Sequence, residues 1–414
     1  MSPRSFDENL ALYAKLAIHG GVCLQPGQEL ILAADVQDKE FARLVVKEVY
    51  IAGAKNVFTM FGDEAMSLLR FEHGSDEAME YAPEWLINGF VQAYSGNAAR
   101  LAIFSSDPNL LKNVAPDRIA KYSKSQGLAS RPLMEFISGF KINWSIVGAP
   151  SPAWAKVVFP NDAESLAMKK LWDAIFLTSR IFEADPLTTW TSHCDSLERR
   201  QTWLNKHDLV ELHFKGPGTD LHVGLAENHQ WKGGWGYAKN GVKCGPNVPT
   251  EEVFTMPHRA NVNGVVSSTK PLSVRGQLLE GIVMEFKDGA AVKATSKTGE
   301  ETLHKLLETD EGANRLGEVA LVPASSKVSQ AGILFYNTLY DENAACHIAM
   351  GKCYSENMAG YDALSDEIRT ENGANDSLIH VDWMIGSREV DVDATAGDGT
   401  TIPLMRSGEW VEKV

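Results

Sequence analysis

The sequence has few basic residues relative to its acids, and it contains no long apolar run. Its 39 lysines and arginines stand against 54 aspartates and glutamates, for a formal net charge of −15. Nucleic-acid phosphates require clustered lysine and arginine, and because no extended basic patch is present we expect no nucleic-acid partner. No stretch approaches the ~20 apolar residues of a membrane span, and the acid-containing first segment differs from a secretory signal. We therefore expect a cytoplasmic protein without membrane insertion.

Cysteine is also scarce and irregularly placed. The five cysteines form no C-x-x-C pair, and their number is odd. A disulfide framework and a zinc-thiolate site are both unexpected, because each needs paired or regularly spaced cysteines. Reduced thiols agree with a cytoplasmic location.

The chain does contain enough apolar material for two domains. It has 414 residues, of which 44% are hydrophobic, so it can bury a substantial core. From about residue 6 to residue 185, helical patterns alternate with short apolar runs at residues 29–35, 56–61, 99–106 and 143–150. Such alternation predicts an N-terminal α/β domain with a largely parallel sheet.

The second part of the chain has a different pattern. Beyond about residue 206, short β-type runs are broken by Gly, Asp-Gly or Gly-Pro turns. This pattern predicts a C-terminal α+β domain with a twisted, mainly antiparallel sheet. We place the N-terminal domain at residues 1–190 and the C-terminal domain at residues 191–414. All candidate site residues fall in the latter, so we expect it to be the catalytic domain.

His380 and Asp382 lie two apart in an apolar, β-branched stretch, HVDWMIG at residues 380–386. In a strand, both side chains point to the same face. A neutral imidazole beside a carboxylate makes half of a divalent-metal site. The alternative is an exposed strand face that carries one polar pair, because His-x-Asp is a common dipeptide pattern.

The segment DENAACHIAMGKCY, residues 341–354, contains three further candidates among small and apolar residues. These residues suit a helix, and a spacing of seven would place His347 and Tyr354 on one helix face. The alternative is a buried, hydrogen-bonded histidine beside a packed tyrosine. Glu342 would need a cation if it were buried, although at a helix start it could simply favour the helix dipole. Cys346 and Cys353, also seven apart, are expected to share another helix face as packing residues.

Two glutamates complete the candidate set. Glu252 lies in PTEEVFTMPH at residues 249–258, which could begin a helical turn or form a strand edge. Glu318 lies in GEVALV at residues 317–322, where we expect it at the mouth of a strand. Each acid taken alone is better explained as a solvated side chain, because glutamate is rarely buried without a partner.

Together these segments resemble a known family. NVPTEEVFTMPH, NRLGEVALVP, LFYNTLYDENAACHIAMGKCY and HVDWMIGS are similar to the aminopeptidase T / aminopeptidase S (PepS-type) family of dinuclear metallo-aminopeptidases, and the similarity extends over nearly the whole chain. The resemblance implies five metal ligands: Glu252, Glu318, His347, His380 and Asp382. It also implies that Tyr354 reaches the metals or the reacting centre, and that Glu342 is either a further ligand or the base that handles the water proton.

The resemblance implies a cofactor, a substrate class and a partner. Two divalent ions about 3.5 to 4 Å apart activate a hydroxide and polarise the scissile carbonyl, which permits peptide hydrolysis at neutral pH. Oxygen and imidazole ligands favour Zn, Co or Mn, with Mg possible. The expected substrates are short peptides with a free N-terminus, and the expected assembly is a homodimer whose N-terminal domains help enclose the active sites. The alternatives are another dinuclear metallohydrolase, such as a dipeptidase or amidase, and a non-catalytic metal-binding protein.

The other histidines carry no such pattern. His222, His258 and His304 are single histidines in polar company, and we interpret them as solvated or structural.

Overall fold

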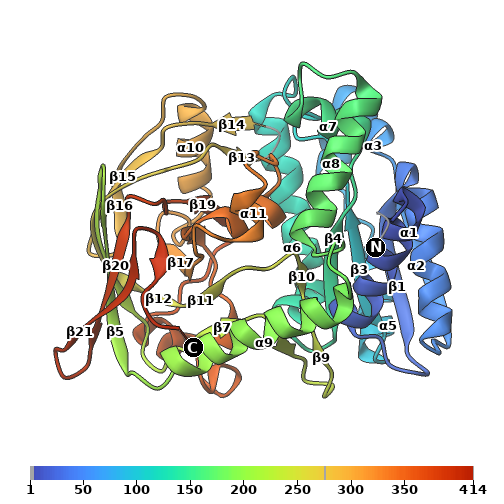
Figure 1. The fold of residues 1–414 in the computed structure, drawn as a ribbon. Helices are drawn as coiled ribbons and strands as arrows, with labels where there is room; N and C mark the ends of the chain where they lie inside the picture. Colours follow the sequence, from blue (N-terminus) through green and yellow to red (C-terminus); the bar gives the residue numbers. More distant parts are fainter. Residues whose placement is uncertain (1–3, 275–276, 414) are drawn as a thin grey trace. The chain divides into compact units, whose positions relative to one another are not determined.

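The computed structural model describes residues 4–274 and 277–413, which divide into two compact units (Figure 1). Unit 1 contains the described residues up to Asp195 together with Trp235–Pro249. Unit 2 contains Ser196–Gly234 and the described residues from Thr250 onward. The sequence placed one boundary at residue 190, whereas the chain passes from unit to unit after Asp195, after Gly234 and after Pro249.

Unit 1 is built on a parallel sheet with the strand order β10-β4-β3-β1-β2. Its strands are β1 (Glu29–Asp35), β2 (Asn56–Gly62), β3 (Ala99–Phe104), β4 (Trp144–Gly148) and β10 (Asn247–Val248); β8 (Gly236–Tyr237) and β9 (Lys243–Cys244) form a separate hairpin. Strand β10 explains why residues 235–249 belong to this unit, and Ser145 reinforces the pairing by donating a hydrogen bond to the Gly245 carbonyl at 2.7 Å. The predicted largely parallel sheet is confirmed.

Helices alternate with the strands of this sheet. They are α1 (Phe6–Leu16), α2 (Lys39–Ile51), α3 (Glu64–His73), α4 (Asp76–Glu80), α5 (Glu84–Ser95), α6 (Pro116–Ser138), α7 (Pro152–Val158) and α8 (Glu164–Thr178). Helix α9 (Pro186–Leu204) begins in this unit and continues past Asp195 into unit 2. Helix α2 shows the packing rule: Phe41, Ala42, Val45 and Val49 recur every three or four residues and are buried. Among the described residues, no helix combines the length and the apolar character that a membrane span needs.

Two large antiparallel sheets form most of unit 2 within the described part of the chain. The larger sheet has the order β16-β15-β12-β6-β5-β20-β21-β22, with β5 (Leu209–Gly216), β6 (Thr219–Leu225), β12 (Pro257–Ser267), β15 (Val283–Lys287), β16 (Ala290–Thr295), β20 (Asp391–Ala396), β21 (Thr401–Arg406) and β22 (Glu409–Trp410). The smaller sheet has the order β19-β18-β17-β11-β7, with β7 (Lys232–Gly233), β11 (Val253–Thr255), β17 (Leu316–Leu321), β18 (His347–Gly351) and β19 (His380–Met384). Strands β13 (Leu272–Val274) and β14 (Gln277–Leu279) pair with each other, and the helices are α10 (Glu300–Leu307), α11 (Lys327–Gln330), α12 (Thr338–Asp341) and α13 (Asp366–Glu371). The predicted α+β domain with mainly antiparallel strands is confirmed.

The core of unit 2 lies between its two sheets. Val319, Ile348 and Trp383, from three neighbouring strands of the smaller sheet, belong to the same buried cluster as Phe214 and Leu221 of the larger sheet. Successive side chains of a strand point to opposite faces. The sequence neighbours of these three residues therefore occupy the other face of the smaller sheet, and several of them are polar.

Candidate metal centre

The face of the smaller sheet that points away from the core collects the predicted site residues. Glu318 lies opposite Ala349 in the β17–β18 pair, and Ala349 lies opposite Asp382 in the β18–β19 pair. Directly opposite residues project to the same side of a sheet, and the small side chain of Ala349 leaves space between the two carboxylates. His380 and Asp382 share this face of β19, as the sequence predicted.

The structure corrects the expected helix over residues 341–354. Helix α12 ends at Asp341, Glu342 begins a short 3₁₀ turn, and His347 is the first residue of strand β18. A strand forms here because Ile348 and Met350, two residues apart, both pack in the core. Strands β17 and β19 also pair with β18 on its two sides and satisfy its backbone hydrogen-bonding groups. His347 and Tyr354 therefore do not share a helix face.

The prediction that Cys346 and Cys353 share a helix face is wrong for the same reason. Cys346 packs in the core between the two sheets, whereas Cys353 packs in a separate cluster with Met256 and Met358. Both thiols are buried, and burial raises the pKa of each to about 11. A neutral thiol is a poor nucleophile, so the expected packing role is supported.

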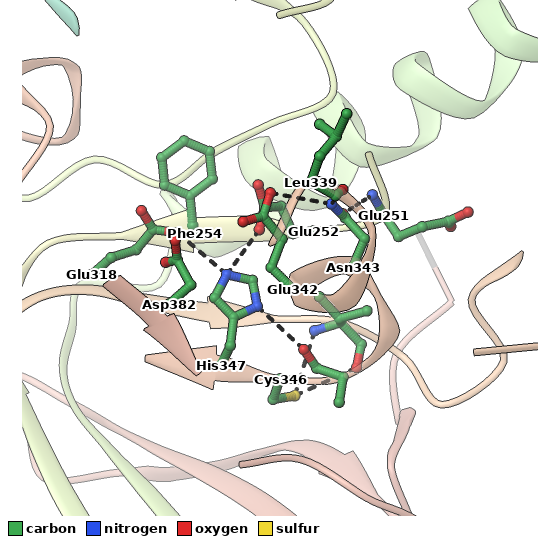
Figure 2. Close-up of polar contacts among 12 residues, drawn as sticks. Glu251, Glu252, Phe254, Glu318, Leu339, Glu342, Asn343, Cys346, His347 and Asp382 are labelled. Atoms are coloured by element: carbon green, nitrogen blue, oxygen red, sulfur yellow. Dashed lines mark hydrogen bonds and ion pairs between the residues drawn. The ribbon is translucent and has the colours of Figure 1, made fainter. Parts of the chain in front are cut away.

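Four short distances connect the carboxylates and imidazoles on this face, and Figure 2 shows the two that involve His347. The Nε2 atom of His347 lies 3.1 Å from Glu252 Oε2 and 3.5 Å from Glu318 Oε1. The Nε2 atom of His380 lies 3.5 Å from Glu318 Oε2 and 3.4 Å from Asp382 Oδ1. The residues thus form two triads, each able to present three ligand atoms, and Glu318 belongs to both with one oxygen directed to each imidazole.

The ring nitrogens on the far side of each imidazole indicate which tautomer is present. His347 Nδ1 lies 3.2 Å from the Ala345 carbonyl, and His380 Nδ1 lies 2.7 Å from the Lys352 carbonyl. A carbonyl only accepts hydrogen bonds, so each Nδ1 carries a hydrogen, and in a neutral ring Nε2 then presents a lone pair to the carboxylates. A lone pair of Nε2 and a lone pair of a carboxylate face each other favourably only when a proton or a metal ion lies between them. Metal-binding histidines are oriented in this way.

Two buried oxygen atoms also fit a cation. Among the described residues, Glu252 Oε2 and Asp382 Oδ1 have no hydrogen-bond partner of acceptable geometry, although both are shielded from solvent. A buried carboxylate oxygen without a partner is costly. Both atoms lie beside an imidazole Nε2, at the positions where a shared cation would satisfy them.

Asn343 holds the two segments that carry Glu252 and Glu342. Its Oδ1 atom accepts a hydrogen bond from the Glu251 backbone N–H at 2.6 Å, and its Nδ2 group donates to the Leu339 carbonyl at 3.0 Å and to Glu342 Oε1 at 3.4 Å. Glu342 is buried, and Figure 2 shows it beside Glu252. The first glutamate of the PTEE motif is used differently, because Glu251 Oε1 accepts a hydrogen bond from the Lys327 backbone N–H at 3.2 Å.

The electrostatics of the site show an excess of buried negative charge. Burial, together with Asp382 and Glu252, raises the pKa of Glu318 to about 7 despite the two imidazoles. Burial and the same two neighbours raise the pKa of Glu342 well above its usual range. Burial disfavours a charged His380, yet Asp382 and Glu318 raise its pKa to about 9.

These pKa directions agree with the charge count. Glu252, Glu318, Glu342 and Asp382 carry four negative charges when ionised, and two divalent cations would supply four positive charges, which leaves the site neutral. One divalent cation would leave two negative charges buried, which costs several kcal/mol unless they are paired. The donor set therefore fits divalent cations that prefer oxygen and imidazole.

Tyr354 approaches this centre from the loop after β18. Its ring centroid lies 4.7 Å from that of His380 and 6.1 Å from that of Phe254, with an edge-on contact to the latter. Burial and the nearby carboxylates, Glu318 and Asp382 foremost, raise its pKa well above the usual value. The phenol therefore keeps its hydrogen and can donate a hydrogen bond.

Sequence reasoning missed Asn343 and Phe254. Asn343 is fully buried, but an asparagine beside Glu342 gives no signal in the sequence that it is buried. Phe254 could have been found from the period of two in PTEEVFTMPH, which places it on the same strand face as Glu252 once β11 is recognised.

Comparisons with known proteins agree over almost the whole chain. The family model for thermophilic metalloproteases (M29) matches residues 6–410. Aminopeptidase T from Thermus thermophilus is 46% identical over 407 residues, which cover 98% of this chain and 99% of that protein. Aminopeptidase 2 from Geobacillus stearothermophilus is 42% identical over 405 residues, which cover 98% of each chain. The solved structure of wild-type AmpT from Thermus thermophilus superposes with a TM-score of 0.92 at 45% identity and covers 99% of this chain and 100% of that one.

Proposed function

The chain belongs to the M29 family of thermophilic metalloproteases and is a metal-dependent aminopeptidase, and from this premise we propose that unit 2 holds two divalent metal ions per chain. The ligands that we assign are Glu252, Glu318, His347, His380 and Asp382. The observation that carries the proposal is the position of Glu318, whose two carboxylate oxygens each lie 3.5 Å from a different imidazole Nε2. A carboxylate can bind two metal ions, one through each oxygen, whereas a neutral imidazole binds one. Zn, Co or Mn suits this donor set best, and Mg is a further candidate.

When bound, the ions lower the pKa of a water molecule, polarise the scissile carbonyl and offer a position to the free α-amine of a peptide. Glu342 is the group we assign to move the water proton to the leaving amine, because it is buried beside the ligands and held by Asn343. Burial and the neighbouring carboxylates Asp382 and Glu252 raise the pKa of Glu342, which favours its holding the proton during the transfer.

Tyr354 is assigned the role of hydrogen-bond donor to the oxyanion that develops on the scissile carbonyl. Its ring packs against His380 and Phe254, which limits its movement. A preorganised donor of this kind typically contributes about 2.7 to 4 kcal/mol to transition-state stabilisation.

The substrates we propose are short peptides with a free N-terminus, and the proposed assembly is a homodimer in the cytoplasm. Unit 1 supports the homodimer, because its edge strand β2 and the helices that follow expose large apolar side chains. These are Phe58 (53% exposed), Phe61 (50%), Met66 (70%), Leu69 (52%) and Trp85 (73%). Sedimentation of the purified protein would distinguish a dimer from a monomer, and a monomer at all concentrations would refute this part of the proposal. The cytoplasmic location is supported by the five cysteines, which form no disulfide among the described residues.

The function is tested by release of the N-terminal residue from matched peptides with free and acetylated amines. The enzyme is first treated with a chelator, and Zn, Co, Mn or Mg is then restored separately. We expect cleavage only after metal is restored and only of the free-amine peptides. Equal cleavage of acetylated peptides would reject the role of the free amine.

Adjacent glutamates provide a matched pair of variants for the ligand assignment. Glu252→Gln is expected to lower metal content and turnover, because Glu252 Oε2 lies 3.1 Å from the His347 imidazole. Glu251→Gln is expected to keep both, because its side chain binds the Lys327 backbone and a glutamine oxygen accepts the same hydrogen bond. The same loss in both variants would count against the assignment of Glu252.

A further inference from the structure

A second group of metal-binding side chains lies on the outer face of the larger sheet in unit 2. His213 of β5 lies directly opposite His222 of β6, and their rings are nearly parallel, with centroids 4.0 Å apart and an interplanar angle of 12°. Leu212 and Phe214, which flank His213 in sequence, are buried in the core. The alternation of the strand therefore holds both imidazoles on the solvent side.

Two carboxylates complete the group. His213 Nε2 lies 2.7 Å from Asp220 Oδ1, and His222 Nδ1 lies 2.9 Å from Glu211 Oε1. One ligand atom each from His213, Asp220 and His222 lies within 4.8 Å of the other two. Because Asp220 and His222 are two apart in β6, they repeat the same-face spacing that His380 and Asp382 have in β19.

We propose that His213, His222 and Asp220 form an exposed binding site for a divalent transition-metal ion, separate from the catalytic centre. Two imidazoles and a carboxylate are ligands that zinc and copper prefer, and a water molecule completes a tetrahedral set around zinc. Glu211 accepts a hydrogen bond from Nδ1 of His222 and so leaves Nε2 of that ring for the ion, which is the usual arrangement behind a metal-binding histidine.

The surroundings of the site admit a cation. The side chains of His213, His222 and Asp220 are 26%, 46% and 67% exposed, so an ion can enter from solvent and Asp220 can shift to accommodate it. The adjacent Asp393, opposite His213 in β20, is held by Arg406 at 2.5 Å. A cationic side chain, Lys215, lies opposite Asp220 in register. The site thus carries the carboxylates of Asp220 and Glu211 beside two imidazoles, and strand pairing holds the two histidines in place before any ion arrives.

The test counts bound ions on the full, untagged enzyme. Wild-type protein and the variants His222→Asn and His213→Asn are dialysed to equilibrium against the same excess of Zn²⁺, and metal per chain is measured by mass spectrometry. His304→Asn is the control, because it removes an exposed histidine from helix α10 of the same unit. We expect both site variants to bind one ion fewer per chain than wild type and the control, with unchanged peptidase turnover.

A spectroscopic measurement distinguishes ligation from an indirect effect. One equivalent of Cu²⁺ is added to protein that holds only the two zinc ions proposed for the catalytic centre, and the copper spectrum is recorded by electron paramagnetic resonance. Wild type is expected to show coupling to two imidazole nitrogens, and His222→Asn to lose one of them. Equal ion counts in wild type and both site variants would overturn the proposal. A site variant that lost peptidase turnover as well as one ion would also overturn it, because the site would then not be separate from the catalytic centre.

Discussion

Replacing Glu318 by glutamine is the sharpest test of the shared-ligand arrangement. Glutamine keeps the shape of the side chain and removes one negative charge. Glu318 is the residue that belongs to both triads, whereas Glu252 serves only the His347 side and Asp382 only the His380 side. Glu318→Gln should therefore weaken the binding of both metal ions, and Glu252→Gln or Asp382→Asn should each weaken the binding of one.

The expected magnitude follows from the charge that glutamine removes. Two unit charges about 4 Å apart interact by about 4 kcal/mol at an effective dielectric constant of about 20. At about 1.4 kcal/mol per factor of ten, removing this charge should lower turnover by about 10³-fold or more. The fold should survive, because the metal-free site has four carboxylates against two imidazoles and the variant reduces that excess.

The assay combines turnover, metal content and thermal unfolding, with and without chelator. We expect wild type to gain stability when metal is restored, because an ion that binds only the folded state shifts the equilibrium toward it. Glu318→Gln should gain little, while its melting temperature in chelator should stay close to that of wild type. Near-normal turnover, or retention of two tightly bound ions, would show that Glu318 is not the shared ligand.

Three further outcomes are expected. Tyr354→Phe should keep its metal content and lose about 10²- to 10³-fold in kcat, the typical value of an oxyanion donor; loss of metal would instead make Tyr354 a ligand. The metal-free protein should lose stability as pH rises from about 4.5 to 9. The folded-state pKa values of Glu318 and His380 are raised to about 7 and about 9. A group whose pKa is raised on folding contributes stability at low pH, and this stability is lost as the pH rises through the folded-state pKa. Thermal melts in chelator would check this, and a flat profile would contradict it. Asn343→Ala should cost about 2 to 4 kcal/mol in urea unfolding, because it leaves buried hydrogen-bonding groups unpaired, and it should lower kcat by displacing Glu342; an unchanged unfolding midpoint would remove its positioning role.

Local patterns were sufficient for the fold class and for part of the site. Short apolar runs that alternate with helical patterns indicated the parallel sheet of unit 1, and glycine-broken β runs indicated the antiparallel strands of unit 2. The sequence placed His380 and Asp382 on one strand face, because their apolar, β-branched surroundings favour a strand and residues two apart in a strand project to the same face. The candidate ligands themselves came from motif resemblance, since any single acid or histidine in these segments has an ordinary structural explanation.

The helix predicted over residues 341–354 shows where local patterns fail. Alanine, methionine and histidine tolerate either conformation, and the spacing of seven between His347 and Tyr354 suits a helix. The strand forms because β17 and β19 provide hydrogen bonds on both edges and the core accepts Ile348 and Met350. These partners are distant in sequence, so no local window contains the information.

The sequence by itself determined the two-part architecture and the chemical types available for a metal centre, because periodicity and side-chain chemistry are local properties. Only the tertiary structure decided that Glu318 faces both imidazoles, that Asn343 is a buried support, and that His213 lies beside His222. The positions of Glu318 and of the His213–His222 pair depend on strand register between segments separated along the chain, whereas Asn343 lies in a 3₁₀ turn held by contacts to distant backbone groups. Register is set by the burial of whole sheet faces, and a shift of one residue would turn the side chains of these strands to the other face.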